Sequence, residues 1–186
     1  MKRTVDLVLI VIATAAFAFP IAITVIFVRI SSPGPAIYWS NRVGRNNVIF
    51  RMPKFRSMRI DTPAAATHLL DNPSQWLTPI GSFLRKSSLD ELPQLWSILK
   101  GDMSFVGPRP ALFNQDDLIE LRTQEGVHKL QPGLTGWAQI NGRDELPITD
   151  KVKLDMEYMQ RQSFWFDVYI LWITFLKVVK RDGVSH

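Results

Sequence analysis

The feature that most constrains this chain is an apolar run near its amino terminus. From Leu7 to Val28 nearly every residue is apolar, with Lys2 and Arg3 before the run and Arg29 after it. A helix of that length reaches about 30 Å, which is the thickness of the hydrocarbon core of a bilayer. The run therefore predicts a membrane helix, and it is too long for the apolar part of a cleavable signal peptide.

Pro20 lies inside this run. Because proline has no amide N–H and clashes with the carbonyl one turn earlier, it kinks or breaks a helix. Basic residues flank both ends, so the positive-inside bias sends neither end clearly across the membrane. Two arrangements fit. Sequence physics alone favours a tilted single-pass anchor with a proline kink, and the alternative is a re-entrant hairpin with both ends cytoplasmic.

Composition limits the chemistry. The 186 residues, 46% of them hydrophobic, suit one domain with a packed core. The absence of cysteine excludes disulfides, a thiol nucleophile and thiolate metal sites. The three histidines lack zinc-ligand spacing, so any metal should be a hard cation held by carboxylates. A net charge of +5 suits an anionic partner, but without a recognisable binding module we expect no nucleic acid partner.

The pattern beyond Arg29 changes to shorter elements. Two apolar runs, at 36–39 and 47–50, flank a basic turn at 41–46 and predict strands or extended segments. Helical periodicity predicts three later helices, at 114–129, 148–162 and 164–180. The last one is apolar and aromatic but carries Asp167 and Lys177. It therefore fits a buried core helix or a helix lying in the membrane interface with its charges upward.

A pair of adjacent carboxylates, Asp90 and Glu91, follows Arg85 by five and six residues. Neighbouring carboxylates repel each other unless a cation lies beside them, so Mg²⁺ and arginine would keep both ionised. A carboxylate held in this way can attack phosphorus and form an acyl phosphate. Taken alone, such a pair is more often a helix cap.

The acid pair also lies at the predicted start of a helix that runs from Asp90 to Lys100 and stops at Gly101. We expect Ser87 or Ser88 to cap this helix with its hydroxyl group. Carboxylates at a helix amino end are held ionised by the exposed N–H groups.

Two basic segments could supply the partner charges. In the first, at 51–59, a strand would place Lys54 and Arg56 on one face. In the second, a Gly-Pro-Arg-Pro turn limits the freedom of Arg109, whose planar guanidinium suits a diphosphate. Basic strands are more often simply solvated. The glycine-rich segment 131–143 fits a nucleotide-binding loop or a purely structural hairpin.

Five ordered segments together resemble the bacterial sugar transferase family, the monotopic phosphoglycosyl transferases, over nearly the whole chain. The segments are the apolar run with its proline, Lys-Phe-Arg-Ser-Met at 54–58, Ser-Leu-Asp-Glu-Leu-Pro-Gln-Leu at 88–95, Gly-Asp-Met-Ser-Phe-Val-Gly-Pro-Arg-Pro at 101–110, and Pro-Gly-Leu-Thr-Gly-Trp-Ala-Gln-Ile-Asn-Gly-Arg at 132–143. The resemblance implies a Mg²⁺-dependent ping-pong reaction that begins glycoconjugate assembly at the membrane. Asp90 would attack a UDP-sugar, UMP would leave, and polyprenyl (undecaprenyl) phosphate would take the sugar-1-phosphate.

The resemblance also implies site residues besides Asp90. Glu91 would complete the dyad and assist metal binding or proton handling. The implied substrate-binding residues are Lys54, Arg85, Arg109, Arg143 and Asp167. Among them, the arginines at 85 and 109 would hold phosphate, the lysine would support the acidic pair, the arginine at 143 would reach the nucleotide, and the aspartate would brace the site from the last helix.

The implied fold is α+β and mostly helical. Residues 1–30 would form a re-entrant helix-break-helix, which replaces the spanning anchor. Residues 31–186 would form a cytoplasmic catalytic domain with interfacial amphipathic helices, on the cytoplasmic face of the bacterial inner membrane. The family breaks its helix at a Ser-Pro pair, which here is Phe19-Pro20. The chain starts at this segment and is expected to be the minimal catalytic unit.

Two points stay open at this level. A chain of this fold could act as a catalytically silent membrane adaptor of a glycan-assembly complex, although the intact acid pair and Arg109 argue against silence. The aromatic face of the last helix could serve a homodimer as easily as the lipid bilayer. No motif decodes which sugar is transferred.

Overall fold

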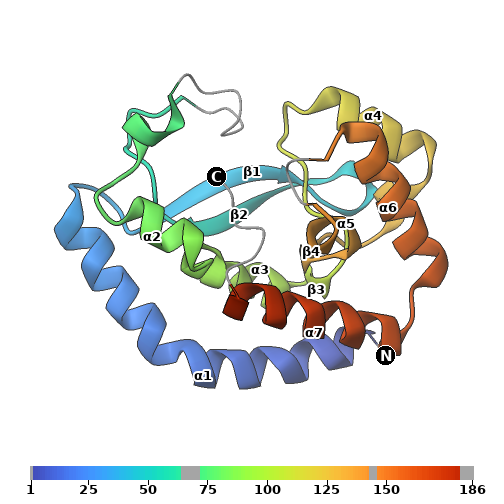
Figure 1. The fold of residues 1–186 in the computed structure, drawn as a ribbon, viewed down its shortest axis with the longest axis horizontal. Helices are drawn as coiled ribbons and strands as arrows, with labels where there is room; N and C mark the ends of the chain where they lie inside the picture. The colour runs from blue at the N-terminus through green and yellow to red at the C-terminus, as the bar shows by residue number, and fades with distance from the viewer. Residues whose placement is uncertain (1, 64–71, 143–145, 181–186) are drawn as a thin grey trace.

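The computed structural model describes residues 2–63, 72–142 and 146–180. Its helices outnumber its strands, and the strands form two small two-stranded sheets, so the predicted mostly helical α+β class is confirmed. Helix α1 (Lys2–Ser31) arcs beneath the other elements, and helix α7 (Phe164–Lys180) lies close to its amino-terminal part (Figure 1).

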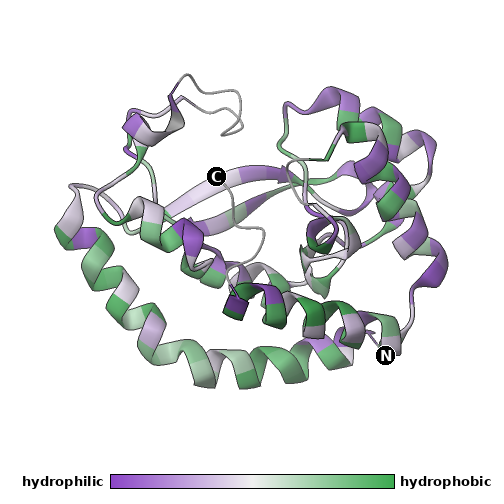
Figure 2. Cartoon of the chain, viewed as in Figure 1, coloured by the Kyte–Doolittle hydropathy of each residue, from purple (hydrophilic) through white to green (hydrophobic). Residues whose placement is uncertain are grey.

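Helix α1 is continuous from end to end, with Pro20 inside it. The Thr24 hydroxyl donates a hydrogen bond of 2.8 Å to the Pro20 carbonyl, and the helix carries on through this turn. The expected interruption of the helix at Pro20 is therefore wrong, because α1 bends but stays one continuous helix (Figure 1). Within the described ranges α1 is the one helix long and apolar enough to cross a membrane, and its apolar character is plain in Figure 2.

The two predicted strands are present as β1 (Ile37–Val43) and β2 (Ile49–Phe55), and the structure pairs them in an antiparallel hairpin. The strand β1 runs further than expected, so the turn falls later, where η1 (Arg45–Asn47) carries two asparagines at positive φ. The face shared by Lys54 and Arg56 was wrongly predicted, because β2 ends at Phe55. Arg56 instead donates to the carbonyls of Ser32 (2.7 Å) and Pro33 (2.6 Å), and so binds the segment after α1.

The next segment contains four short helices, namely η3 (Pro73–Trp76), α2 (Gly81–Lys86), η4 (Leu89–Gln94) and α3 (Leu95–Lys100). The predicted cap is wrong, because no side chain caps η4. Ser88 adopts φ 55°, and the Ser87 hydroxyl bonds back to Phe83 at 2.8 Å, so this pair ends α2. The predicted stop at Gly101 is confirmed, with φ 91°.

Strands β3 (Ser104–Val106) and β4 (Gly133–Thr135) pair in parallel, and α5 (Trp137–Ile140) follows directly. The structural hairpin considered for 131–143 is therefore wrong, because its strand pairs with a distant segment. The first late helix is shorter than predicted: α4 (Asp116–Gln124) ends before Gly126 adopts φ 76°, and η5 (Val127–Lys129) follows. The predictions of α6 (Ile148–Arg161) and α7 are confirmed.

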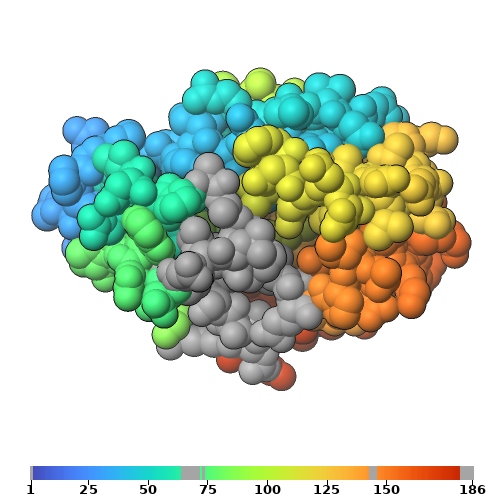
Figure 3. Space-filling model, turned by 90° about the horizontal axis from the view of Figure 1, so that it is seen from above, coloured from blue at the N-terminus to red at the C-terminus, as the bar shows by residue number. Residues whose placement is uncertain are grey.

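The hydrophobic core has two main parts, and α1 contributes to both. Ile10 joins the larger cluster with Ile98 and Ile170, and Val28 joins a second cluster with Phe55 and Leu84. Figure 3 shows the side of the molecule opposite α1, where the hairpin, α4 and α6 follow one another across the surface. The outer side of α7 is aromatic and exposed, as at Trp165 (76%), Trp172 (57%) and Phe175 (57%).

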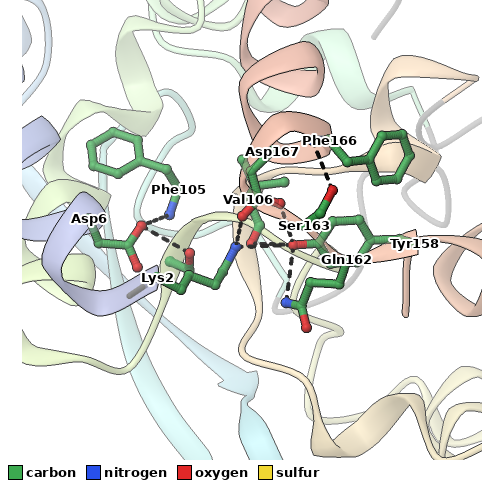
Figure 4. A network of polar contacts seen from close by, with 10 residues as sticks. Lys2, Asp6, Phe105, Val106, Tyr158, Gln162, Ser163, Phe166 and Asp167 are labelled. Atoms are coloured by element: carbon green, nitrogen blue, oxygen red, sulfur yellow. Dashed lines mark hydrogen bonds and ion pairs between the residues drawn. The ribbon is translucent and has the colours of Figure 1, made fainter. Parts of the chain in front are cut away.

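Polar side chains fix the amino-terminal end of α1 to the rest of the chain. Lys2 points towards Tyr158 and pairs with Asp167, and the Tyr158 hydroxyl donates to Asp167 at 2.8 Å (Figure 4). Asp6, which is buried, accepts hydrogen bonds of 3.0 Å from both the hydroxyl of Ser104 and the amide of Phe105. The start of α1 is thus bonded to α6, α7 and β3.

Candidate active site

The acid pair lies in η4, a tight helix that packs against β2. Asp90 is 8% exposed, although aspartate is rarely buried. Pro93 is accommodated inside η4, and Leu89 and Leu92 face the core beside Phe55. Hydrophobic contacts of η4 therefore hold its carboxylates against the hairpin.

Glu91 joins two of the predicted cations. Its Oε1 atom lies 3.1 Å from the Lys54 ammonium and 3.2 Å from an Arg109 guanidinium nitrogen. All three side chains are largely shielded from water, so the interaction is weakly screened. Residues from β2, η4 and the turn after β3 thus meet at one carboxylate.

Burial raises the pKa of Asp90, and the neighbouring Glu91 adds to this effect. The cations Lys54, Arg85 and Arg109 oppose it. None of the residues that the structure describes donates a hydrogen bond to the Asp90 carboxylate. A carboxylate without such bonds keeps its oxygen lone pairs available, which is what a nucleophile requires.

Burial also lowers the pKa of Lys54, and the positive charges of Arg109 and Arg42 lower it further. Glu91 and Asp90 oppose this shift. Sequence reasoning missed Arg42, which lies on the same hairpin face as Lys54 and donates to Ser40 at 3.0 Å. The register of the hairpin could have revealed it. Because Ser40 pairs with Met52, the even-numbered residues of both strands share one face of the hairpin, and Arg42 and Lys54 are among them.

Arg85 comes from the last turn of α2, and its Nε atom donates to the Ser57 hydroxyl at 3.1 Å. Burial lowers the pKa of Arg85, whereas the negative charge of Asp90 opposes that shift. Arg85 is thus close enough to Asp90 for a direct electrostatic interaction. Ser57, which orients it, was not identified from the sequence.

One predicted substrate-binding residue, Asp167, lies apart from this group. Asp167 is bound by Lys2 and Tyr158 at the start of α1, so its contacts brace a helix junction, and its role towards substrate stays a prediction. Arg143 lies outside the described residues.

The described residues hold no group of three or more acidic, histidine or cysteine side chains arranged around a metal ion. The adjacent carboxylates of Asp90 and Glu91 are the candidate ligands at this site. Mg²⁺ is usually held by one or two carboxylates together with substrate phosphates and water. The pair therefore fits a Mg²⁺ ion that binds with a diphosphate, and does not fit a metal held by the protein alone.

The family model described as "Bacterial sugar transferase" matches residues 1–181. The chain belongs to the bacterial sugar transferase family. The match runs through α1, the hairpin, the acid pair and α7, so the segments that build the site are all included.

Several relatives whose names state an activity are similar to the chain. It is 38% identical over 187 residues to the UDP-glucose:undecaprenyl-phosphate glucose-1-phosphate transferase of Escherichia coli, covering 95% of the chain and 40% of that protein. It is 37% identical over 200 residues to the undecaprenyl-phosphate galactose phosphotransferase of Salmonella typhimurium, covering 98% and 41%. The chain thus spans about two fifths of the length of these two relatives.

A relative of similar size is the uncharacterized sugar transferase EpsL of Bacillus subtilis. It is 37% identical over 188 residues, covering 100% of the chain and 91% of EpsL. Because each of the three matches covers at least 95% of the chain, the shared region includes the acid pair and most of α1.

Proposed function

We propose that this chain is a phosphoglycosyl transferase that moves a sugar-1-phosphate from a UDP-sugar to polyprenyl (undecaprenyl) phosphate and releases UMP, at the first membrane step of glycoconjugate assembly. The observation that carries the proposal is the buried Asp90, beside Glu91 and within the field of Lys54, Arg85 and Arg109. The activities named for two relatives support the donor and acceptor classes.

Asp90 is the nucleophile in this proposal. One carboxylate oxygen attacks the phosphorus next to the sugar and forms an acyl-phosphate bond, while the bond from that phosphorus to the oxygen of UMP breaks. A phosphate oxygen of polyprenyl phosphate then attacks the same phosphorus. This second displacement forms the lipid-linked diphosphate sugar and restores the Asp90 carboxylate, so the reaction is ping-pong.

The cations orient the anionic substrates. Arg109 and Arg85 bind phosphate oxygens, and Lys54 offsets the negative charge of the acid pair. In the free enzyme Glu91 holds Lys54 and Arg109 in place through its Oε1 atom. When bound, Mg²⁺ would be held by Asp90 and Glu91 and would neutralise the diphosphate charge.

The membrane arrangement belongs to the same proposal. We place α1 as a re-entrant helix, with both ends on the cytoplasmic side and α7 in the interface. Both ends of α1 are bonded to the same body: Arg3 donates to the carbonyl of Leu99 at 2.6 Å, and Arg56 holds Ser32 and Pro33. A spanning helix would put these ends about 30 Å apart across the lipid.

The activity test uses detergent-solubilised protein with Mg²⁺, a panel of UDP-sugars and polyprenyl phosphate. Without acceptor, we expect about one UMP per enzyme and an intact mass increased by one sugar phosphate. Asp90→Asn should show neither, whereas Asp61→Asn, which alters an exposed ion pair with Arg59, should behave as wild type. Normal turnover by Asp90→Asn would refute the nucleophile, and no release by wild type with any donor would favour the silent adaptor.

The topology test exploits the absence of cysteine. Thr4→Cys and Pro35→Cys each place one thiol at an exposed position near one end of α1. In spheroplasts, a membrane-impermeant maleimide should label neither thiol until the membrane is permeabilised. Labelling of one of the two in intact spheroplasts would show that α1 spans the bilayer.

A further inference from the structure

The turn that carries Arg109 is held through its carbonyl groups. Pro108 and Pro110 have no amide N–H, so this turn cannot be tied down through those donors. Its successive carbonyls accept three hydrogen bonds from three separate segments: Pro108 from the Gly133 amide at 2.9 Å, Arg109 from Arg122 at 2.8 Å, and Pro110 from Arg42 at 3.2 Å. The bond to Arg109 itself comes from a side chain of α4.

Arg122 is a buried cation with one ionic partner from a different helix. It is 7% exposed, and Asp155 on α6 is 1% exposed. The Nε and Nη2 atoms of Arg122 lie 3.0 Å and 2.6 Å from Oδ2 of Asp155. Because a guanidinium is planar and rigid, these two bonds fix the direction in which its remaining nitrogen, Nη1, donates. That direction is towards the Arg109 carbonyl.

Packing behind the turn is incomplete. A pocket of about 30 Å³, partly open to solvent, is lined by all three residues of the turn and by Arg122 and His128. Pro108 and Pro110 are themselves buried, but side-chain contacts with the turn are missing where the pocket lies. On the pocket side the hydrogen bond from Arg122 therefore restrains the Arg109 backbone in place of close packing.

We propose that Arg122, itself oriented by Asp155, is a positioning residue that fixes the turn bearing Arg109 and so aims the Arg109 side chain at the acid pair. The inference rests on the proposed function, because it assigns Arg109 to phosphate binding. A purely stabilising role explains less, since a buried ion pair can often be replaced by apolar side chains without loss of stability. An apolar pair could not donate to the Arg109 carbonyl.

The kinetic test compares wild type with Arg122→Lys and Asp155→Asn. Lysine keeps the charge but cannot make three directed bonds in one plane, and asparagine keeps the shape of aspartate without its charge. We expect kcat/KM for the UDP-sugar to fall about tenfold or more in each, since a bond from a charged donor is lost or misdirected. Lys153→Gln on α6, which removes an exposed pair with Asp150, is the matched control and should stay near wild type.

A double-mutant cycle separates positioning from loss of fold. In an Arg109→Ala background, Arg122→Lys should cause little further loss, because the side chain that it positions is gone. If Arg122→Lys lowers kcat/KM by the same factor in both backgrounds, the inference is overturned. A reduced folded fraction would give that result, because it lowers activity by the same factor whatever other defect is present. Thermal unfolding of each variant provides the folded fraction directly.

A measurement without substrate keeps this inference separate from the proposed function. Phenylglyoxal modifies arginine side chains, and peptide mass spectrometry can follow Arg109 alone. We expect Arg109 to react several-fold faster in folded Arg122→Lys and Asp155→Asn than in wild type, and at the wild-type rate in Lys153→Gln. Unchanged reactivity in the first two would overturn the positioning role. Faster reaction without turnover by wild type would reject the proposed function and leave the positioning role standing.

Discussion

The contact between Asp6 and β3 gives a prediction that tests how α1 is attached to the domain. The Phe105 amide donates to Oδ1 of Asp6 at 3.0 Å, on the side of β3 that faces away from β4. The Ser104 hydroxyl donates to the same oxygen. In Asp6→Ala both donors lose their acceptor in a buried site.

The expected magnitude follows from these two bonds. A hydrogen bond to a charged group contributes about 1.5–3 kcal/mol, so losing two of them should cost about 3 kcal/mol or more. When reclosing is faster than chemical exchange, so that the opening equilibrium sets the rate, 3 kcal/mol corresponds to about a 150-fold faster hydrogen exchange of the Phe105 amide. Asp6→Asn keeps an acceptor oxygen without the charge, and should accelerate exchange only about tenfold.

Amide exchange of isotope-labelled protein in detergent micelles, followed by NMR, measures this directly. The Ser104 amide, bonded to Pro132 at 2.8 Å, and the Gly107 amide, bonded to Thr135 at 2.9 Å, are internal controls because neither bond involves Asp6. The reasoning is refuted if Phe105 exchanges at its wild-type rate in Asp6→Ala. It is also refuted if all three amides accelerate equally, since that pattern indicates global unfolding.

Three further predictions concern the acid pair and its supporting turn. Because burial raises the pKa of Asp90, the contribution of this one residue to stability is greatest below its unfolded-state pKa and is lost as pH rises through its folded-state pKa; Asp90→Asn should therefore raise the Tm at neutral pH, which calorimetry can check. Glu91→Gln removes a charge that raises the pKa of both Asp90 and Lys54, so both limbs of the pH–rate profile should move to lower pH. Gly107→Ala places a Cβ 2.2 Å from the Gln131 carbonyl oxygen and should destabilise the fold by about 1–3 kcal/mol, measured by denaturant unfolding.

Local patterns in the sequence were sufficient to predict the long helices and the two strands of the hairpin. The apolar run predicts α1, and the periodicity of 148–162 and 164–180 predicts α6 and α7 almost to the residue. Two short apolar runs on either side of a basic turn predict the two strands that the structure pairs in a hairpin. These elements carry their own signal because each is long enough for its apolar face to repeat several times.

Contacts between distant segments could not be predicted in the same way. Strands β3 and β4 have three residues each, too few to show a period, and their parallel pairing joins Ser104 to Gly133. Nothing local tells that Asp6 accepts from Phe105, or that Arg56 turns away from Lys54 to bind Ser32. For the site, the grouping of Lys54 and Arg109 with the acid pair came from ordered motifs, whereas Arg42 and Ser57 were missed because each looks like ordinary surface when taken alone.

The way α1 packs links the membrane to the chemistry. Its amino-terminal part is bonded through Asp6 to β3, and β3 leads directly into the turn that carries Arg109. Its carboxy-terminal part packs through Val28 against Phe55 and Leu84, in the cluster that Leu89 and Leu92 of η4 also join. The two segments that bring Arg109 and the acid pair together therefore each rest on a different part of one helix. If α1 lies in the bilayer as proposed, the depth of α1 sets the height of Asp90 above the lipid. A change in the bend of α1 would then shift the turn that carries Arg109 relative to the acid pair in η4.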